Sequence, residues 1–146
     1  MKPNKICHFQ LYILLLALAF VLGDCDIGFL RKYHVRIQNG LRNKTMDVHC
    51  KSKDDDLGRH TLSSYKIYEF SFRANYFRST LFFCNLWYRD HHVVFDAFTT
   101  DVTLLDKCGG DSDATDCNWK GQEDGVYLLN TASKKWNFMY HWGHKK

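Results

Sequence analysis

The chain has few of the features that divide a protein into domains or carry it across a membrane. It has one proline, Pro3, in 146 residues, no internal repeat and no low-complexity linker. Its apolar run LYILLLALAFVLG, residues 11–23, has 13 residues, whereas a membrane-spanning helix needs about 20. The sequence therefore predicts one domain of about 120 residues, with no segment embedded in a membrane.

The amino terminus has the composition of a secretory signal peptide. Lys2 and Lys5 precede the short apolar run, and the small or apolar residues Val21 and Gly23 suit positions −3 and −1 of a cleavage site. The run has no 3.6-residue period, which argues against a buried amphipathic helix. We predict a signal peptide at residues 1–23, with cleavage after Cys25 as the alternative, and a secreted, extracellular domain at 24–146.

The net charge of the chain is also small. The formal charge is +4, and it falls to +2 when residues 1–23 are removed because two lysines and no acid leave with them. A nucleic-acid protein concentrates Lys and Arg on one face or tail. The mild and mixed charge of this chain excludes a nucleic-acid partner.

Most of the chain alternates between apolar and polar residues with a period of two. Aromatic residues make up 16% of the sequence, and β-branched residues and short polar breaks accompany them, which together are typical of strands and hairpins. The pattern predicts an all-β fold, a small antiparallel β-sandwich of seven or eight strands, with a short helix allowed in a connection. The clearest strand segments are 33–38, 45–51, 66–73, 80–88, 92–100, 125–129 and 135–142.

The most charged segment, HCKSKDDDLG at residues 49–58, raises the question of a metal or acid/base site. Asp54, Asp55 and Asp56 are consecutive, whereas a calcium loop places its oxygen ligands at alternate positions. Aspartates before Gly58 are common turn residues at the end of a strand. We expect a turn or solvated loop that binds no cofactor and no metal.

The sequence offers no catalytic centre. His91 and His92 are adjacent, so on a strand they would face opposite ways and could not bind one zinc ion together. There is no G-x-S-x-G motif, and a cysteine nucleophile would need an unpaired thiol beside a histidine. We therefore expect no catalytic residues and no enzymatic activity.

Cysteines of a secreted chain are expected to form disulfides. Cys7 leaves with the signal peptide, and Cys25 leaves too if cleavage follows it. The remaining four cysteines permit three pairings, and Cys108 could close on Cys117 across eight residues. We favour Cys50 with Cys117 and Cys84 with Cys108, because one long segment carrying two cysteines can reach two strands.

The ordered motifs along the chain resemble the plant self-incompatibility S-protein homologues. They are VRIQNGL at 35–41, VHCKSKDDDLG at 48–58, YEFSFRANYFRSTLFFCNLWY at 68–88, FDAF at 95–98 and DGVYL at 124–128. The resemblance implies a small disulfide-bonded β-sandwich whose usual four cysteines fall on Cys50, Cys84, Cys108 and Cys117. It also implies a secreted ligand that binds a cell-surface receptor or membrane protein, with pollen rejection as the known role. The alternative is a secreted defence or toxin-like protein that acts on foreign cells.

Two further predictions concern the surface of the domain, which we expect to be a monomer. Asn43-Lys44-Thr45 is an acceptor for N-glycosylation at Asn43. Loops held on a rigid scaffold usually carry recognition, so partner binding is expected in Leu41–Lys44, Asp54–His60, Arg89–His92 and Gly109–Asp116. The named candidates are Asp54, Asp55, Asp56, Arg89, His91 and His92.

Overall fold

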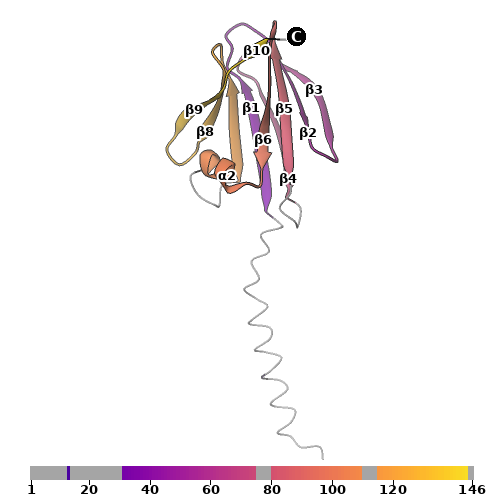
Figure 1. Cartoon of the computed structure of the whole chain (residues 1–146), viewed down its shortest axis with the longest axis vertical. Helices are drawn as coiled ribbons and strands as arrows, with labels where there is room; N and C mark the ends of the chain where they lie inside the picture. The colour runs from indigo at the N-terminus through magenta and orange to yellow at the C-terminus, as the bar shows by residue number, and fades with distance from the viewer. Residues whose placement is uncertain (1–12, 14–30, 75–79, 110–114, 145–146) are drawn as a thin grey trace, which may run out of the picture.

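Two five-stranded sheets face each other in this computed structural model, which describes residues 13, 31–74, 80–109 and 115–144 (Figure 1). The predicted signal peptide, residues 1–23, lies outside the described residues except for Ile13. So does the greater part of the predicted recognition loop Gly109–Asp116. The described residues of the predicted domain, 31–74, 80–109 and 115–144, form the sandwich.

Each sheet combines strands from distant parts of the sequence. The β1 sheet has the order β4 (Ile67–Arg73), β1 (Lys32–Asn39), β7 (Asp116–Gly121), β8 (Val126–Asn130) and β9 (Lys135–Tyr140). The β5 sheet has the order β10 (Gly143–His144), β6 (His91–Thr99), β5 (Leu81–Tyr88), β2 (Met46–Lys51) and β3 (Asp56–Leu62).

The predicted all-β sandwich is confirmed, with differences in the number and direction of its strands. All the segments predicted as strands are strands, and β3, β7 and the two-residue β10 add to them. The pair β1–β7 is parallel, whereas the other strand pairs in the described chain are antiparallel. Parallel pairing is possible here because β1 and β7 are far apart in the sequence, with strands β2–β6 and helix α2 (Val102–Gly109) between them.

The core forms where the apolar faces of the two sheets meet. Val35 and Ile37 of β1 and Val48 and Leu86 of the β5 sheet are all fully buried, because alternate residues of a strand point to the same face. The Trp119 indole N–H of β7 donates a hydrogen bond of 2.9 Å to the Ala97 carbonyl of β6. The largest core side chain is therefore also fixed in orientation between the two sheets.

The two disulfides correct the predicted pairing. Cys50 bonds to Cys84, and Cys108 bonds to Cys117. Cys50 and Cys84 are directly opposite each other on the neighbouring strands β2 and β5, with Cα atoms 4.1 Å apart. Both sulfurs are therefore already bonded and cannot pair with Cys108 or Cys117. The prediction was wrong because it assumed that the two strands did not pair with each other.

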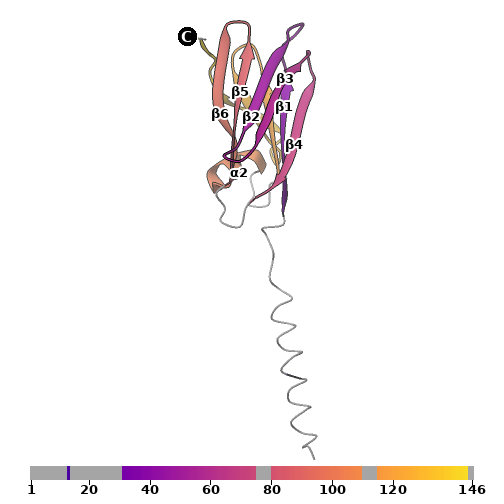
Figure 2. The ribbon, with the colours of Figure 1, turned by 90° about the vertical axis from the view of Figure 1, so that its right-hand side faces the viewer.

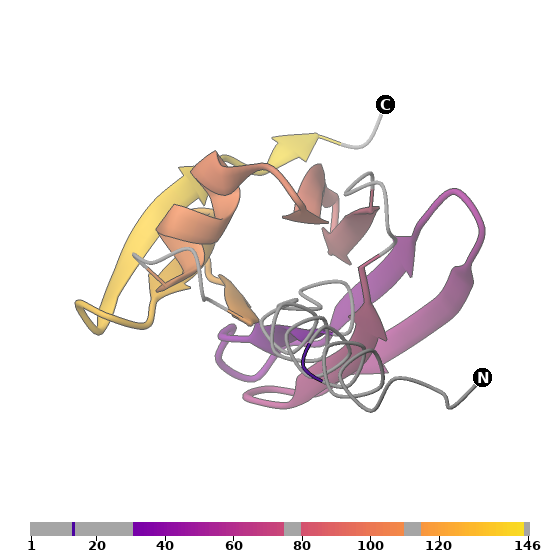
Figure 3. The ribbon, with the colours of Figure 1, turned by 90° about the horizontal axis from the view of Figure 1, so that it is seen from below.

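The short helix α2 lies across one end of the sandwich, which we call the helix end (Figures 1 and 2). Asp101 caps the helix by accepting a hydrogen bond of 3.0 Å from the Thr103 backbone N–H. Leu104 and Leu105 are buried. Seen from this end, α2 lies beside β8 and β9, with β2 and β3 on the opposite side (Figure 3).

The other end, which we call the hairpin end, is organised by the buried side chain of Asn39. Its amide nitrogen donates to the carbonyls of Lys44 and Leu62, and its amide oxygen accepts from the Leu41 backbone N–H, at 2.8–2.9 Å. Its backbone also bonds to the β3–β4 turn at Tyr65 and Lys66. One amide therefore connects two turns and the end of β3.

Candidate functional site

The structure places the predicted recognition residues at opposite ends of the sandwich. In the β5 sheet, Asp47 of β2 is opposite Trp87 of β5, next to the β5–β6 turn at the hairpin end. Lys51 is opposite Phe83, at the end where the acidic segment begins. The length of β2, six residues at about 3.3 Å each, separates the acidic segment from the Arg89 turn. The candidate residues therefore do not form one compact site.

The acidic run is partly a turn, as predicted, and partly a strand. Asp54 and Asp55 lie in the β2–β3 turn and are exposed, and their backbone N–H groups donate to the Ser52 hydroxyl at 3.3 and 2.9 Å. Asp56 is instead the first residue of β3, paired with Lys51. The prediction of a loop was therefore wrong for Asp56.

The Asp56 carboxylate is surrounded by hydrogen-bond donors. Lys51 Nζ lies 2.8 Å from it, His49 Nε2 lies 2.5 Å from it, and the Gly58 backbone N–H donates to it at 3.0 Å. The hydrogen bonds from Lys51 first, and then from His49 and Gly58, hold the pKa of Asp56 well below its usual range. Asp56 therefore stays ionised at physiological pH and is poorly suited to act as a general acid or base.

The described residues contain no cluster of three His, Cys, Asp or Glu side chains that could hold a metal ion. His91 and His92 belong to β6 rather than to a loop, contrary to the prediction. They face opposite ways, as expected: His91 packs against Tyr88, whereas His92 stacks on Trp87 with ring centroids 5.0 Å apart. His92 Nε2 also lies 3.0 Å from Asn85 Oδ1. The stack therefore fixes the position of the His92 ring.

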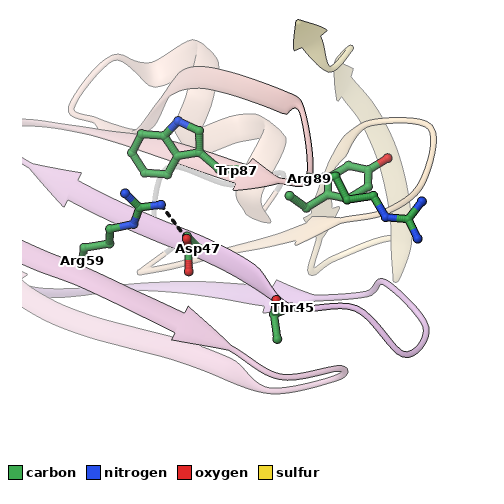
Figure 4. A pocket seen from close by; sticks show the side chains of 6 residues that line it. Thr45, Asp47, Arg59, Trp87 and Arg89 are labelled. Carbon is green, nitrogen blue, oxygen red and sulfur yellow. Dashed lines mark hydrogen bonds and ion pairs between the residues drawn. The ribbon is translucent and has the colours of Figure 1, made fainter. Parts of the chain in front are cut away.

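An open hollow of about 110 Å³ lies at the hairpin end of the β5 sheet (Figure 4). We call it the Trp87 hollow, and its lining residues are Thr45, Asp47, Arg59, Trp87, Tyr88 and Arg89. Figure 4 shows Arg59 and Arg89 on opposite sides of Asp47. The lining comes from β2, β3 and β5 and from the turns beside them, so the pairing of these strands creates the site.

The polar groups on the β3 side of the hollow hold one another in place. Asp47 accepts hydrogen bonds from the Thr61 hydroxyl at 2.6 Å and from Arg59 Nη2 at 2.5 Å. The Thr61 bond, and then Arg59, keep the pKa of Asp47 below its ordinary value although partial burial opposes the shift. The Arg59 guanidinium also lies over the Trp87 ring, 4.7 Å from its centroid, a favourable cation–π position. The hollow is therefore preorganised.

Two of the six lining residues of this hollow, Arg59 and Arg89, lie in the recognition loops predicted from the sequence, Asp54–His60 and Arg89–His92. Arg59 belongs to strand β3, which was not predicted as a strand, rather than to a loop. The outward-facing pattern of residues 45–51 does place Asp47 on the solvent face of a strand. Nothing in the sequence shows that Arg59 and Trp87 lie on either side of this strand.

The predicted glycosylation site lies in the β1–β2 turn at the same end. Asn43 is exposed and has a φ of 54°, which asparagine tolerates better than most residues. Its backbone N–H lies 3.2 Å from the Ser64 hydroxyl, which itself donates to the Leu41 carbonyl. The turn is therefore held by the neighbouring hairpin, and the Asn43 side chain is left on the surface.

No helix within the described residues is long and apolar enough to cross a membrane. This finding concerns only the described ranges.

Comparison with known proteins assigns the chain to a family. The family model for plant self-incompatibility protein S1 matches residues 34–142. Self-incompatibility protein S1 of Papaver rhoeas is 30% identical over 134 residues, covering 90% of this chain and 91% of that protein. S-protein homolog 74 of Arabidopsis thaliana is 35% identical over 120 residues, which is 77% of each chain.

A solved structure also matches the fold. It comes from the SPH (Self-Incompatibility Protein Homologue) proteins, described as a widespread family of small, highly stable, secreted plant proteins. It covers 77% of this chain and 96% of its own, with a TM-score of 0.59 at 12% identity. The family match and the shared sandwich together show that this chain is a member of the plant self-incompatibility S-protein homologue family.

Proposed function

We propose that the protein is a secreted signalling ligand that acts by binding a cell-surface protein and has no catalytic role. The observation that carries the proposal is its similarity to Papaver rhoeas self-incompatibility protein S1 along 90% of the chain. The polar clusters support it, because the carboxylates of Asp47 and Asp56 are bound by hydrogen bonds and ion pairs that lower their pKa values. Such clusters are suited to recognition rather than to proton transfer.

Maturation would begin with removal of residues 1–23, or of residues 1–25, and the mature chain would act as a monomer. The exposed position of Asn43 in a held turn supports modification by a glycan there. A glycan on this turn would lie beside Thr45, at the rim of the Trp87 hollow. Amino-terminal sequencing and intact mass of the secreted protein test both points.

Recognition would involve exposed residues at one or both ends of the sandwich. The exposed candidates for partner contact are Asp54 and Asp55 at the helix end and Arg89 at the hairpin end. A standard protein interface covers about 800 Å² on each partner, which is enough to span the outer face of the β5 sheet between them. Charge reversal at the two ends, made separately, distinguishes a partner that contacts one end from a partner that contacts both.

The test measures binding of the labelled mature protein to membrane fractions from several tissues of the source plant and to protein-free lipid vesicles. A signalling ligand binds saturably to the membranes of particular cells, and protease treatment of those membranes removes the binding. Binding or leakage with protein-free vesicles would favour the defence or toxin-like alternative instead.

The variants Asp54→Lys with Asp55→Lys, and Arg89→Glu, are the matched pair for this test. We expect at least one to weaken membrane binding while the melting temperature stays close to that of the wild type, because exposed charges contribute little to stability. Binding that withstands both variants would move recognition away from these loops.

A further inference from the structure

Strand β4 forms one lateral edge of the β1 sheet (Figure 2), and within the described residues it pairs with β1 alone. An edge strand presents a row of unpaired backbone N–H and C=O groups, which proteins usually protect by shortening, bending or charging the strand. The other three sheet edges of the described chain have such protection. The pairing of β3 with β2 and of β9 with β8 is interrupted by shifts in register, and β10 has two residues.

The edge of β4 has none of these protections. Its seven residues pair with β1 in one continuous register, and its sequence, IYEFSFR, contains no proline and no lysine. Its acid, Glu69, is already paired with Arg36 and His34 on the outer face of the sheet. The edge is therefore regular, and it carries little charge that would repel another strand.

The hydrogen bonds of β1 show which backbone groups of β4 are free. The Asn39 N–H donates to the Lys66 carbonyl, and residues along an antiparallel pair alternate between bonded and non-bonded positions. The bond from the His34 N–H to the Thr115 carbonyl, on the β7 side of β1, gives the same alternation. Every second residue of β4 therefore directs its backbone groups away from β1. These residues are Ile67, Glu69, Ser71 and Arg73.

The inner side of this edge is only partly covered. Tyr68, Phe70 and Phe72 are half-buried, whereas the inner-facing Val35 and Ile37 of the neighbouring β1 are fully buried. The centroids of neighbouring rings in this aromatic row are 5.9 and 6.0 Å apart. Apolar side chains of an added strand would cover the exposed parts of the rings and remove apolar surface from water. The ligand that fits is therefore an extended segment with apolar residues at alternate positions.

The outer side of the edge adds a charge requirement. Arg73 of β4 and Lys32 of β1 are directly opposite each other, and both are exposed. Neither forms an ion pair within the described ranges. Like charges directly opposite each other in a sheet are destabilising. An acidic residue beside Arg73 on an added strand would offset this repulsion.

We propose that the edge of β4 binds an extended segment of the cell-surface partner as an added strand. The segment runs antiparallel to β4, because that pairing is the more stable per residue. The free N–H and C=O groups of β4 bond to its backbone, its apolar side chains cover the aromatic row, and an acidic residue pairs with Arg73. This inference rests on the proposed function, because it states how the partner is held. Since β4 runs between the two ends of the sandwich, loop contacts at either end can accompany the added strand.

Hydrogen exchange of the mature, ¹⁵N-labelled protein, followed by nuclear magnetic resonance, tests whether the edge is open. We expect the amide protons of Glu69 and Ser71 to exchange fast, because they point to solvent. The amide proton of Phe70 points toward β1 and should exchange slowly. Slow exchange at Glu69 and Ser71 in the free protein would show that the edge is already covered, and it would overturn the proposal.

The probe for strand addition is the peptide EVTVTVT, acetylated and amidated. Its valines face the aromatic row and its glutamate lies opposite Arg73 when it pairs antiparallel with β4. We expect a saturable shift of the β4 amide signals. At about 90% saturation, exchange at Glu69 and Ser71 should slow about tenfold, because these amides exchange only from the unbound fraction. Unchanged exchange at the highest soluble concentration of peptide contradicts the proposal.

Two matched peptides test the backbone and the charge separately. N-methylation of the two threonines that lie opposite Ser71 and Glu69 removes backbone donors that face β4, and it should abolish the shift. Replacement of the glutamate by lysine should weaken binding about fivefold, which is the scale of one exposed ion pair. Equal binding of the N-methylated peptide excludes strand addition. Equal binding of the lysine peptide excludes the pairing with Arg73.

The variant Ser71→Pro carries the test to the partner itself. It removes one free N–H and keeps the pairing with β1, because proline is tolerated on an edge strand where its nitrogen faces solvent. We expect membrane binding and peptide binding to weaken at least about fivefold, with the melting temperature close to that of the wild type. Ser71→Ala, which loses only the hydroxyl, is the matched control and should change neither.

The outcomes separate this inference from the signalling function. Full membrane binding by folded Ser71→Pro would contradict strand addition at β4. A lack of saturable membrane binding in the wild type would contradict the signalling function instead. The peptide comparison uses the wild-type protein, so it decides the question of the edge even where Ser71→Pro fails to fold.

Discussion

The two ends of the sandwich are held together by different means. At the helix end, the Cys108–Cys117 disulfide joins α2 to β7. The Cys50–Cys84 disulfide joins β2 to β5 next to the Lys51–Phe83 pair, where β2 ends. At the hairpin end, the described residues contain no disulfide, and the buried Asn39 amide connects the turns by hydrogen bonds. A disulfide lowers the conformational entropy of the unfolded chain, whereas the hydrogen bonds of a buried amide stabilise only the folded state. The hairpin end should therefore depend more on the details of packing.

The two polar clusters on the outer face of the β5 sheet differ in the same way. Asp56 at the helix end is saturated by Lys51, His49 and Gly58. At the hairpin end, Thr61 and Arg59 bind the Asp47 carboxylate, whereas the exposed Arg89 makes no hydrogen bond or ion pair with another residue in the described ranges. The two clusters therefore differ in the exposed charge that lies beside the bound carboxylate.

Loss of the Cys50–Cys84 disulfide should have the largest effect on stability. This bond closes a loop with a sequence separation of 34, against 9 for Cys108–Cys117. In the chain-entropy model, the double variant Cys50→Ala with Cys84→Ala should lose about 4 kcal/mol and the other pair about 2.5 kcal/mol. Denaturant unfolding of the two variants measures the difference. Equal losses would show that strain or residual structure outweighs loop length, and non-reducing peptide mapping checks the pairing itself.

Asn39→Ala should come next and should affect the hairpin end. It leaves the Leu41 N–H and the Lys44 and Leu62 carbonyls without their partner, and each orphaned buried group costs about 1–3 kcal/mol. Relaxation of the turns and entry of water reduce the total cost of these three groups. We therefore expect the free energy of unfolding to fall by about 2–4 kcal/mol, measured by denaturant unfolding.

The neighbouring variant Gln38→Ala is the control for Asn39→Ala. Gln38 lies on the same strand with its side chain on the outer face, so its loss should stay within about 0.5 kcal/mol. Hydrogen exchange should then show loss of protection in the hairpin-end turns of Asn39→Ala and little change at the helix end. Uniform loss of protection would remove the distinction between the two ends.

Asp47→Asn should have a smaller effect that depends on pH. The pKa of Asp47 is lowered in the folded state, so its contribution is present above the unfolded pKa of about 3.9 and is lost as the pH falls through the folded pKa. We expect the variant to lose about 1 kcal/mol at pH 7, given that Arg59 is largely exposed. The difference from wild type should shrink toward pH 2. A difference that is constant from pH 7 to pH 2 would assign the loss to packing rather than to charge.

Lys51→Ala should have the smallest effect on the fold and a clear effect on one carboxyl. Lys51 is the largest cause of the lowered pKa of Asp56, so its removal should move that pKa upward, toward about 3.9. Carbon-detected nuclear magnetic resonance of the Asp56 carboxyl measures the change. Added salt should produce part of the same shift in the wild type, because exposed ion pairs are screened. A pKa that does not move would assign the effect to His49 and Gly58.

Much of the fold could be predicted from local patterns. The period-two alternation identified seven strands, because a strand buried on one face must alternate. It did not identify the buried face of β9, where a shift in register at Val126 and Tyr127 leaves Phe138 exposed and packs Tyr140 against the core. Strand β3 was missed because its sequence, DLGRHTL, begins with turn residues and has only one buried side chain, Leu62. Strand β7, DCNWKG, was missed for a related reason, since glycine, aspartate and asparagine are rare in strands. Tertiary pairing overrides local propensity in both.

The sequence by itself determined the all-β class, seven of the strands, and the family through its ordered motifs. Only the tertiary structure decided which strands are neighbours, and that single choice fixed the rest. The pairing of β2 with β5 set the disulfides, because two cysteines opposite each other on adjacent strands lie within bonding distance. The placement of β2 between β3 and β5 brought Arg59 and Trp87 to the same hollow. The order of strands in a sheet is set by the long-range packing of whole strands, so no local stretch of sequence can predict that order.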